Sequence, residues 1–159
     1  MGYTEATTTI HAPVEIVWAS LNDIARTPDW VTGLADARLE TPEPVGVGSV
    51  YTDYNRLGPF LQVTRWRVTA FEPHKLQVHE SESTVLPSRM TLELSPTAAG
   101  TALRMTVEYR LLPGLGAISR ALENVLMNHL LQRVLQQNQA SLNAYLTGRE
   151  ASPMQSETA

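Results

Sequence analysis

The stretch from Leu115 to Leu146 contains no proline and no glycine after Gly116. It therefore predicts one long α-helix, which at 1.5 Å per residue would extend roughly 48 Å. That length exceeds any strand expected in a chain of 159 residues, because strands are usually about 3–10 residues long. The remaining chain is expected to form a sheet that curves around this helix, and such a geometry leaves a hollow between the two.

The long helix carries two apolar stripes that point in opposite directions. The second half contributes Leu131, Val134, Leu135, Leu142, Tyr145 and Leu146, and the first half contributes Leu115, Ile118, Leu122, Val125 and Leu126. Either the helix bends near Asn128–His129 and buries both stripes, or it is straight and its Leu122 face lies outside the core. Gly148 is expected to cap the helix, and residues 148–159 are expected to form a disordered tail.

The residues before the helix predict two short helices and seven strands. Glu5–His11 reads as the first strand, Pro13 starts a helix that is interrupted at Asn22–Asp23, and Thr27–Pro28 ends the second helix. Alternating polarity then predicts six further strands: Leu34–Glu40, Ser49–Asn55, Gln62–Phe71, Leu76–Glu82, Ser88–Ser95 and Thr101–Arg110. Short turns between them indicate an antiparallel meander, and the whole pattern predicts an α+β domain over residues 1–147.

The alternation assigns side chains to the two faces of this sheet. Trp66, Val68 and Ala70 are expected on the inner face, whereas arginines and glutamates such as Arg67 and Glu93 are expected on the outer face. The outer charges indicate either a docking surface for an anion or, the simpler interpretation, a solvated face with cross-strand charge pairs.

Composition excludes several classes of protein. The net charge of −4 argues against a nucleic-acid partner. The absence of cysteine excludes disulfides and thiolate chemistry and fits a reducing cytoplasm. The N-terminal residues lack the apolar core of a signal peptide, and no stretch is apolar enough to predict an integral membrane segment.

The inner face carries medium-sized side chains and few aromatics, so it is not expected to fill the space under the helix completely. An apolar hollow with a few polar groups is typical of a site for a hydrophobic small molecule. The expected ligand-binding residues are Trp66, Val68, Val78, Ser88, Met90, Leu92, Met105, Val107 and Tyr109 from the sheet, and Asn124 and Met127 from the helix.

Three residues are candidates for catalysis. If Val78 faces inward, Glu80 does so too, and a carboxylate in an apolar cavity can act as a general acid or base. A slip of one residue would instead place Glu80 outside. Arg120 and Tyr54 are expected to orient the ligand and stabilise an oxyanion, although Arg120 can equally be a surface residue.

The histidines and the standard motifs add little. His11, His74, His79 and His129 have no metal-site spacing; His79 is expected to point outward, and His129 can lie in the cavity or on the surface. No catalytic-serine, phosphate-loop or dinucleotide motif is present, so neither a metal nor a cofactor is expected.

Several fragments in order resemble the helix-grip superfamily, also called SRPBCC or START-like, and within it the polyketide cyclase/dehydrase family. They include Ile10–Pro13, Pro28–Trp30, Gly46–Ser49, Trp66–Pro73 and Pro113–Gly116, so that the resemblance covers roughly residues 6–146. It implies a curved seven-stranded antiparallel sheet wrapped around a long C-terminal helix, with a hydrophobic cavity between them. The resemblance provides no catalytic motif that could be assigned to residues of this chain.

Three functions remain open from the sequence. The cavity is expected to bind a polyketide-like or lipid-like molecule and to cyclise or dehydrate it, with Glu80 as the acid or base. Alternatively, the protein carries a lipid or hydrophobic metabolite without changing it. The third possibility is an interaction module, a homodimer for example, that uses the outward apolar face of the long helix.

Overall fold

The computed structural model describes residues 2–84, 86–110 and 117–151. For residues 57, 117–120, 122, 123 and 149–151 only the backbone is described. The elements in chain order are β1 (Gly2–Ile10), α1 (Val14–Asn22), the 3-10 helix η1 (Ile24–Asp29), β2 (Leu34–Leu39), β3 (Val50–Leu57), β4 (Phe60–Glu72), β5 (Leu76–Ser81), β6 (Ser88–Thr97), β7 (Gly100–Tyr109) and α2 (Ala117–Ala151).

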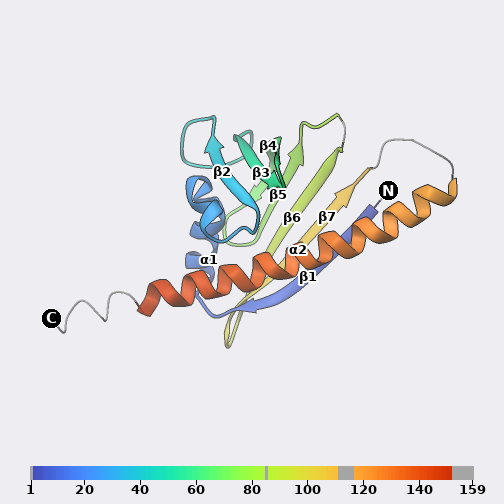
Figure 1. Ribbon diagram of the computed structural model, residues 1–159. Coiled ribbons are helices and arrows are strands. Elements are labelled where there is room, and N and C mark those ends of the chain that lie inside the picture. Colours follow the sequence, from blue (N-terminus) through green and yellow to red (C-terminus); the bar gives the residue numbers. More distant parts are fainter. Residues whose placement is uncertain (1, 85, 111–116, 152–159) are drawn as a thin grey trace.

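The seven strands form one antiparallel sheet in the order β1-β7-β6-β5-β4-β3-β2. Strands β2 to β7 are a meander, and β1 returns to pair with β7 at the far edge. The long helix α2 lies across the sheet and contacts β1, while α1 and η1 lie near the C-terminal end of α2 (Figure 1). The predicted α+β helix-grip fold, with two short helices after the first strand, is confirmed.

One tight corner holds the β6–β7 turn against the chain that leaves β1. Gly100 has φ +144°, and a Cβ atom there would lie 2.2 Å from the main-chain oxygen of Ile10. Beside it, the hydroxyl of Thr101 donates to the main-chain oxygen of Ala12 at 2.8 Å. Only glycine allows this approach, which fixes the start of α1 relative to the sheet.

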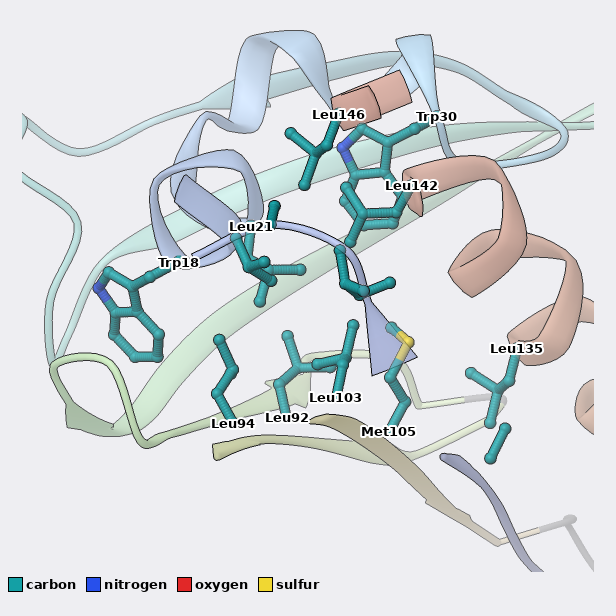
Figure 2. Close-up of a cluster of buried hydrophobic side chains, with 14 residues drawn as sticks. Trp18, Leu21, Trp30, Leu92, Leu94, Leu103, Met105, Leu135, Leu142 and Leu146 are labelled. Atoms are coloured by element: carbon teal, nitrogen blue, oxygen red, sulfur yellow. The ribbon is translucent and has the colours of Figure 1, made fainter. Parts of the chain in front are cut away.

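The main core lies between the sheet and the second half of α2. Figure 2 shows Leu92 and Leu103 pointing from the sheet toward Leu142 and Leu146 of α2, with Trp30 beside them. Leu142 is fully buried, and burial of a leucine side chain contributes about 1.5–3 kcal/mol. The stripe predicted on this half of the helix is therefore the one that holds α2 on the sheet.

The helix α2 is continuous, with no sharp bend near Asn128–His129 (Figure 1). Val125, Leu126 and Leu130 are 67%, 72% and 57% exposed. Of the two interpretations, the straight helix with two faces is correct for the side chains that are described. The homodimer predicted from the outward face stays a prediction.

The helix also continues through Gly148, the expected cap, to Ala151, and the rest of the predicted tail lies outside the described residues.

The outer face of the sheet carries cross-strand charge pairs. Arg65 binds Glu40 at 2.8 Å and also pairs with Glu82, and Arg67 binds Glu82 at 2.8 Å. Arg104 bridges Glu5 at 2.8 Å and Glu93 at 3.4 Å. These arginines already have carboxylate partners and are about half exposed, so the solvated-face interpretation fits better than an anion-docking surface.

A β-bulge changes the faces that the alternation predicted for the end of β4, and the observed register of β5 differs from the prediction as well. Val68 pairs with His79, but Ala70 pairs with Val78, so Thr69 is an extra residue on β4. After the bulge Phe71, not Ala70, continues the inner face and packs against the core. On β5, His79 lies on the inner face, which corrects its predicted outward position.

Candidate ligand-binding cavity

A cavity of about 300 Å³ lies between the sheet, the second half of α2 and the η1–β2 segment. One part of its wall is apolar and is formed by Leu21, Ile24, Trp30, Val31, Leu34, Leu86, Met90, Leu92, Met105, Val107, Leu131, Val134 and Leu135. The polar part includes Tyr51, Asp53, Asn55, Gln62, Thr64, Trp66, His79, Ser83, Ser88, Tyr109 and Asn138. The cavity is therefore amphipathic.

Strands β3 and β4 create the polar part through their register. Tyr51 pairs with Trp66, Asp53 with Thr64 and Asn55 with Gln62, and all six side chains line the cavity. Alternate residues of a strand share a face, so these three pairs form a row that leads toward the β3–β4 turn. In the sheet, β5 separates this row from β6 and β7, which contribute apolar lining residues.

Tyr51 and His79 are hydrogen-bonded inside the sheet, with the hydroxyl 2.6 Å from Nδ1. Their rings meet edge to face, with centroids 5.4 Å apart. His79 is 2% exposed, and burial lowers its pKa to about 4. Burial, and then the charge of Asp53, raises the pKa of Tyr51. Both rings are therefore neutral at physiological pH.

Asp53 is the group in this cavity that titrates near neutral pH. Burial raises the pKa of its carboxyl to about 7. The indole N–H of Trp66 lies close enough to oppose part of this shift, but it does not reach the geometry of a hydrogen bond, and Nε1 remains buried without a partner. A carboxyl that is half-ionised near neutrality can both accept and donate a proton.

The segment between η1 and β2 closes one side of the cavity and is held at two points. The side-chain oxygen of Asn138 on α2 accepts from the main-chain N–H of Thr32 at 2.9 Å. The main-chain oxygen of Gly33 accepts from the N–H of Arg56 on β3 at 2.8 Å. The wall that carries Trp30 and Val31 is thus attached to both the helix and the sheet.

Tyr109 on β7 is hydrogen-bonded to the first half of α2. Its hydroxyl donates to Oδ1 of Asn128 at 2.6 Å and lies 3.2 Å from the main-chain oxygen of Asn124. Burial raises the pKa of this phenol, so it remains a neutral donor.

The structure places the predicted binding residues in different surroundings. Seven of them line the cavity, namely Trp66, Ser88, Met90, Leu92, Met105, Val107 and Tyr109. Val68 packs in an adjacent core cluster with Tyr51. Val78 pairs with Thr91 and, although buried, is not part of the cavity wall. Asn124 and Met127 are half-buried on α2 and do not line the cavity either.

The predicted placement of the catalytic residues is wrong for two of the three. Glu80 lies on the outer face, 48% exposed and 3.8 Å from Arg89, because the inner position on β5 belongs to His79. Tyr54 also faces outward, with the Arg38 guanidinium 5.2 Å from its ring centroid. The side chain of Arg120 is outside the described residues, so its role stays a prediction.

The sequence prediction missed Tyr51, Asp53 and His79. A signal for the first two was present in the Gly58–Pro59 turn. A two-residue turn there sets Tyr51 opposite Trp66, as observed, so an inward Trp66 requires an inward Tyr51 and hence Asp53. His79 had no such signal, because an apolar inner face favours Val78 over a histidine.

The other histidines lie away from the cavity. His11 and His129 are exposed, and His74 occupies a turn with φ 65°, so the surface interpretation of His129 is correct. No group of three His, Asp or Glu side chains that could hold a metal ion occurs among the described residues.

The sequence model of a known family, described as polyketide cyclase/dehydrase and lipid transport, matches residues 1–147. The chain belongs to this family. It has the SRPBCC helix-grip fold, a fold that binds hydrophobic ligands. None of the curated proteins matches the chain, and none of the described helices is long and apolar enough to cross a membrane.

Solved structures of this fold include two aromatase/cyclases. The Zhui aromatase/cyclase from Streptomyces sp. R1128 has a TM-score of 0.69 at 16% identity, over 91% of this chain and 94% of that one. The di-domain aromatase/cyclase StfQ of the steffimycin pathway has a TM-score of 0.74 at 16% identity, and the match covers 94% of this chain and 51% of the StfQ chain. A Rhodobacter sphaeroides protein has a TM-score of 0.69 at 20% identity, and the match covers 92% of this chain and 93% of that one. These likenesses show the shared fold.

Proposed function

We propose that this member of the polyketide cyclase/dehydrase and lipid transport family binds a compact amphipathic organic molecule in its cavity. The observation that carries the proposal is the division of one cavity into an apolar wall and a polar row. An apolar body would lie against Leu92, Met105 and Leu135, and a polar substituent would reach Asp53 and His79. Concave sites of this composition are typical of ligand pockets.

The size of the cavity favours a small ring system over a long lipid. At about 300 Å³ it lies at the lower end of the range of roughly 300–1,000 Å³ for ligand pockets. A polyketide-like polyphenol of two or three rings is compact and carries oxygen substituents, which matches both the volume and the polar row. A diacyl lipid would need more apolar space than the described wall encloses.

The same site has the groups for cyclisation or dehydration of such a ligand. Asp53 can take a proton from carbon next to a carbonyl or return it to a departing hydroxyl, since its pKa is raised to about 7. The names of the related aromatase/cyclases support this chemistry as the first reaction to test. A carrier that leaves its ligand unchanged is the second candidate, because Glu80 and Tyr54, which were expected to catalyse, lie outside the cavity.

A thermal-shift panel of flavonoids, aromatic polyketide analogues, sterols and fatty acids tests the binding. A ligand at a hundred times its Kd adds about 2.7 kcal/mol to the free energy of unfolding, which corresponds to about 5–10 °C for a domain of this size. We expect this shift for the compact oxygenated rings. Mass spectrometry of the bound compound then separates a dehydratase, which releases water, from a carrier. The absence of a shift with every class would contradict the proposal.

A further inference from the structure

Two buried ring nitrogens in the polar part of the cavity have no hydrogen-bond partner among the described residues. They are Nε1 of Trp66 and Nε2 of His79, and both side chains line the cavity. Buried polar groups in native proteins are nearly always paired. An unpaired pair beside an open cavity therefore points to a partner that a ligand supplies.

The hydrogen bond with Tyr51 decides what His79 offers to that ligand. The ring is neutral, so one of its nitrogens carries a proton and the other does not. Donation from the Tyr51 hydroxyl to Nδ1, across 2.6 Å, satisfies the phenol proton and puts the ring proton on Nε2. Donation in the other direction would leave the phenol proton without a partner. His79 thus presents an N–H donor, as Trp66 does.

The charges around this pair disfavour an anionic ligand. No lysine or arginine occurs among the described residues that line the cavity, and Asp53 is the acidic side chain in the wall. The arginines of β4 and β7 bind carboxylates on the opposite face of the sheet. A ligand carboxylate would be desolvated here without a cation and beside a second carboxyl, which is unfavourable on both counts.

We propose that His79 and Trp66 together form a donor site for an uncharged oxygen of the ligand, a ketone or phenol oxygen, and that the cavity rejects carboxylates. The inference rests on the proposed function and narrows its ligand class. Free fatty acids and other carboxylic acids are then poor ligands, whereas ketones and phenols with the same apolar body are good ones.

Three probes with one apolar skeleton test the inference by isothermal titration at pH 8: naphthalene, 2-acetylnaphthalene and 2-naphthoate. We expect the ketone to bind more tightly than naphthalene, by about 2- to 10-fold for each donor that it meets. We expect 2-naphthoate to bind at least about tenfold more weakly than the ketone. Equal or tighter binding of 2-naphthoate would overturn the inference while leaving the proposed function intact. Failure of all three probes to bind would contradict both.

Two variants connect the preference to the named donors. Trp66→Phe and His79→Leu each remove one N–H, so the ratio of ketone to naphthalene affinity is expected to fall by about 2- to 10-fold in each. His79→Gln keeps an N–H donor at a similar reach and is expected to retain most of the ratio. An unchanged ratio in both Trp66→Phe and His79→Leu would overturn the inference.

Asp53 and Arg120 supply the remaining controls. Asp53→Asn removes the negative charge and is expected to reduce the discrimination against 2-naphthoate at pH 8. If Arg120, which the sequence predicts to orient the ligand and stabilise an oxyanion, binds a ligand carboxylate, 2-naphthoate will bind tightly and Arg120→Gln will abolish that binding. That outcome would contradict the uncharged-ligand inference.

Discussion

The hydroxyl of Tyr51 on β3 lies 2.6 Å from Nδ1 of His79 on β5, so the two side chains meet over the inner face of β4, the strand that separates them in the sheet. The contact fixes the orientation of a buried, neutral imidazole at the edge of the cavity. It also joins Tyr51, whose inward position follows from the β3–β4 register, to His79, whose inward position no local pattern predicted.

Tyr51→Phe tests the contribution of this contact to stability. The substitution keeps the ring but leaves Nδ1 of His79 buried without a partner, which costs about 1–3 kcal/mol. Urea denaturation should show this loss in the free energy of unfolding. Tyr54→Phe, on the outer face, is the matched control and should change it by less than about 0.5 kcal/mol. An equal effect of the two substitutions would contradict the buried hydrogen bond.

Asp53→Asn is expected to stabilise the protein at pH 8. The pKa of Asp53 is raised from 3.8 to about 7, so between about pH 4 and pH 7 the unfolded chain has lost a proton that the folded protein keeps. The free energy of unfolding therefore falls as pH rises across that window. The ionisation of Asp53 lowers the free energy of unfolding by at most roughly 4 kcal/mol. The actual loss is smaller than this limit because the carboxyl is partly exposed to solvent.

The control is Asp29→Asn, which removes an exposed carboxyl in η1 and should be neutral. Denaturation at pH 8 compares the two variants with the parent protein. A destabilising effect of Asp53→Asn, or none, would show that the carboxyl is not held in an unfavourable environment.

The titration of His79 is expected to change the free energy of unfolding with pH in the opposite direction to that of Asp53. Its pKa is lowered from 6.5 to about 4, so between these values the unfolded chain takes up a proton that the folded protein does not. The free energy of unfolding falls as pH drops through this window, which opposes the effect of Asp53. Asp53→Asn should therefore lose stability between pH 6.5 and pH 4.5 more steeply than the parent protein does. Parallel pH profiles would contradict this assignment.

Filling the cavity should abolish binding without unfolding the domain. Val134 on α2 lines the cavity, and Val134→Trp would occupy space that the ligand needs, at a cost of about 1–3 kcal/mol if the core is strained. Val125→Trp makes the same change on the same helix, where the side chain is 67% exposed, and should leave affinity unchanged. Calorimetry with 2-acetylnaphthalene distinguishes them, and retained binding in Val134→Trp would place the ligand elsewhere.

Glu80→Gln should affect neither binding nor stability. The side chain is 48% exposed on the outer face, and its distance of 3.8 Å from Arg89 indicates a weak surface pair, worth at most about 1 kcal/mol. Titration and urea denaturation of this variant beside Asp53→Asn check the point. A loss of affinity in Glu80→Gln would restore the inward placement that the sequence predicts.

The fold was predictable because its signals are local. Alternating polarity gave the strands, turn residues such as Gly58–Pro59 separated them, and the absence of proline and glycine gave α2. Each of these depends on neighbours in the chain. The end of α2 differs from the prediction, because the helix continues three residues past the exposed Gly148, and the surroundings of Gly148 give no structural reason for this extension.

The site was only partly predictable because it depends on register and on exceptions to the polarity rule. The apolar lining from β6 and β7 followed from alternation. The bulge at Thr69 breaks that alternation, and His79 takes an inner position that hydrophobicity assigns to Val78. A bulge leaves no clear sequence signal, and a polar residue inside a core contradicts the rule that predicts the core.

The indole N–H resonance of Trp66 gives the most direct test of whether a ligand binds in this cavity. It can be assigned by its absence from the ¹H–¹⁵N spectrum of Trp66→Phe and followed while 2-acetylnaphthalene is added. We predict a saturable downfield shift for Trp66, no comparable shift for Trp18, which packs outside the cavity wall, and no response in Val134→Trp. Saturable binding detected by calorimetry with an unmoved Trp66 resonance would contradict a ligand in this cavity.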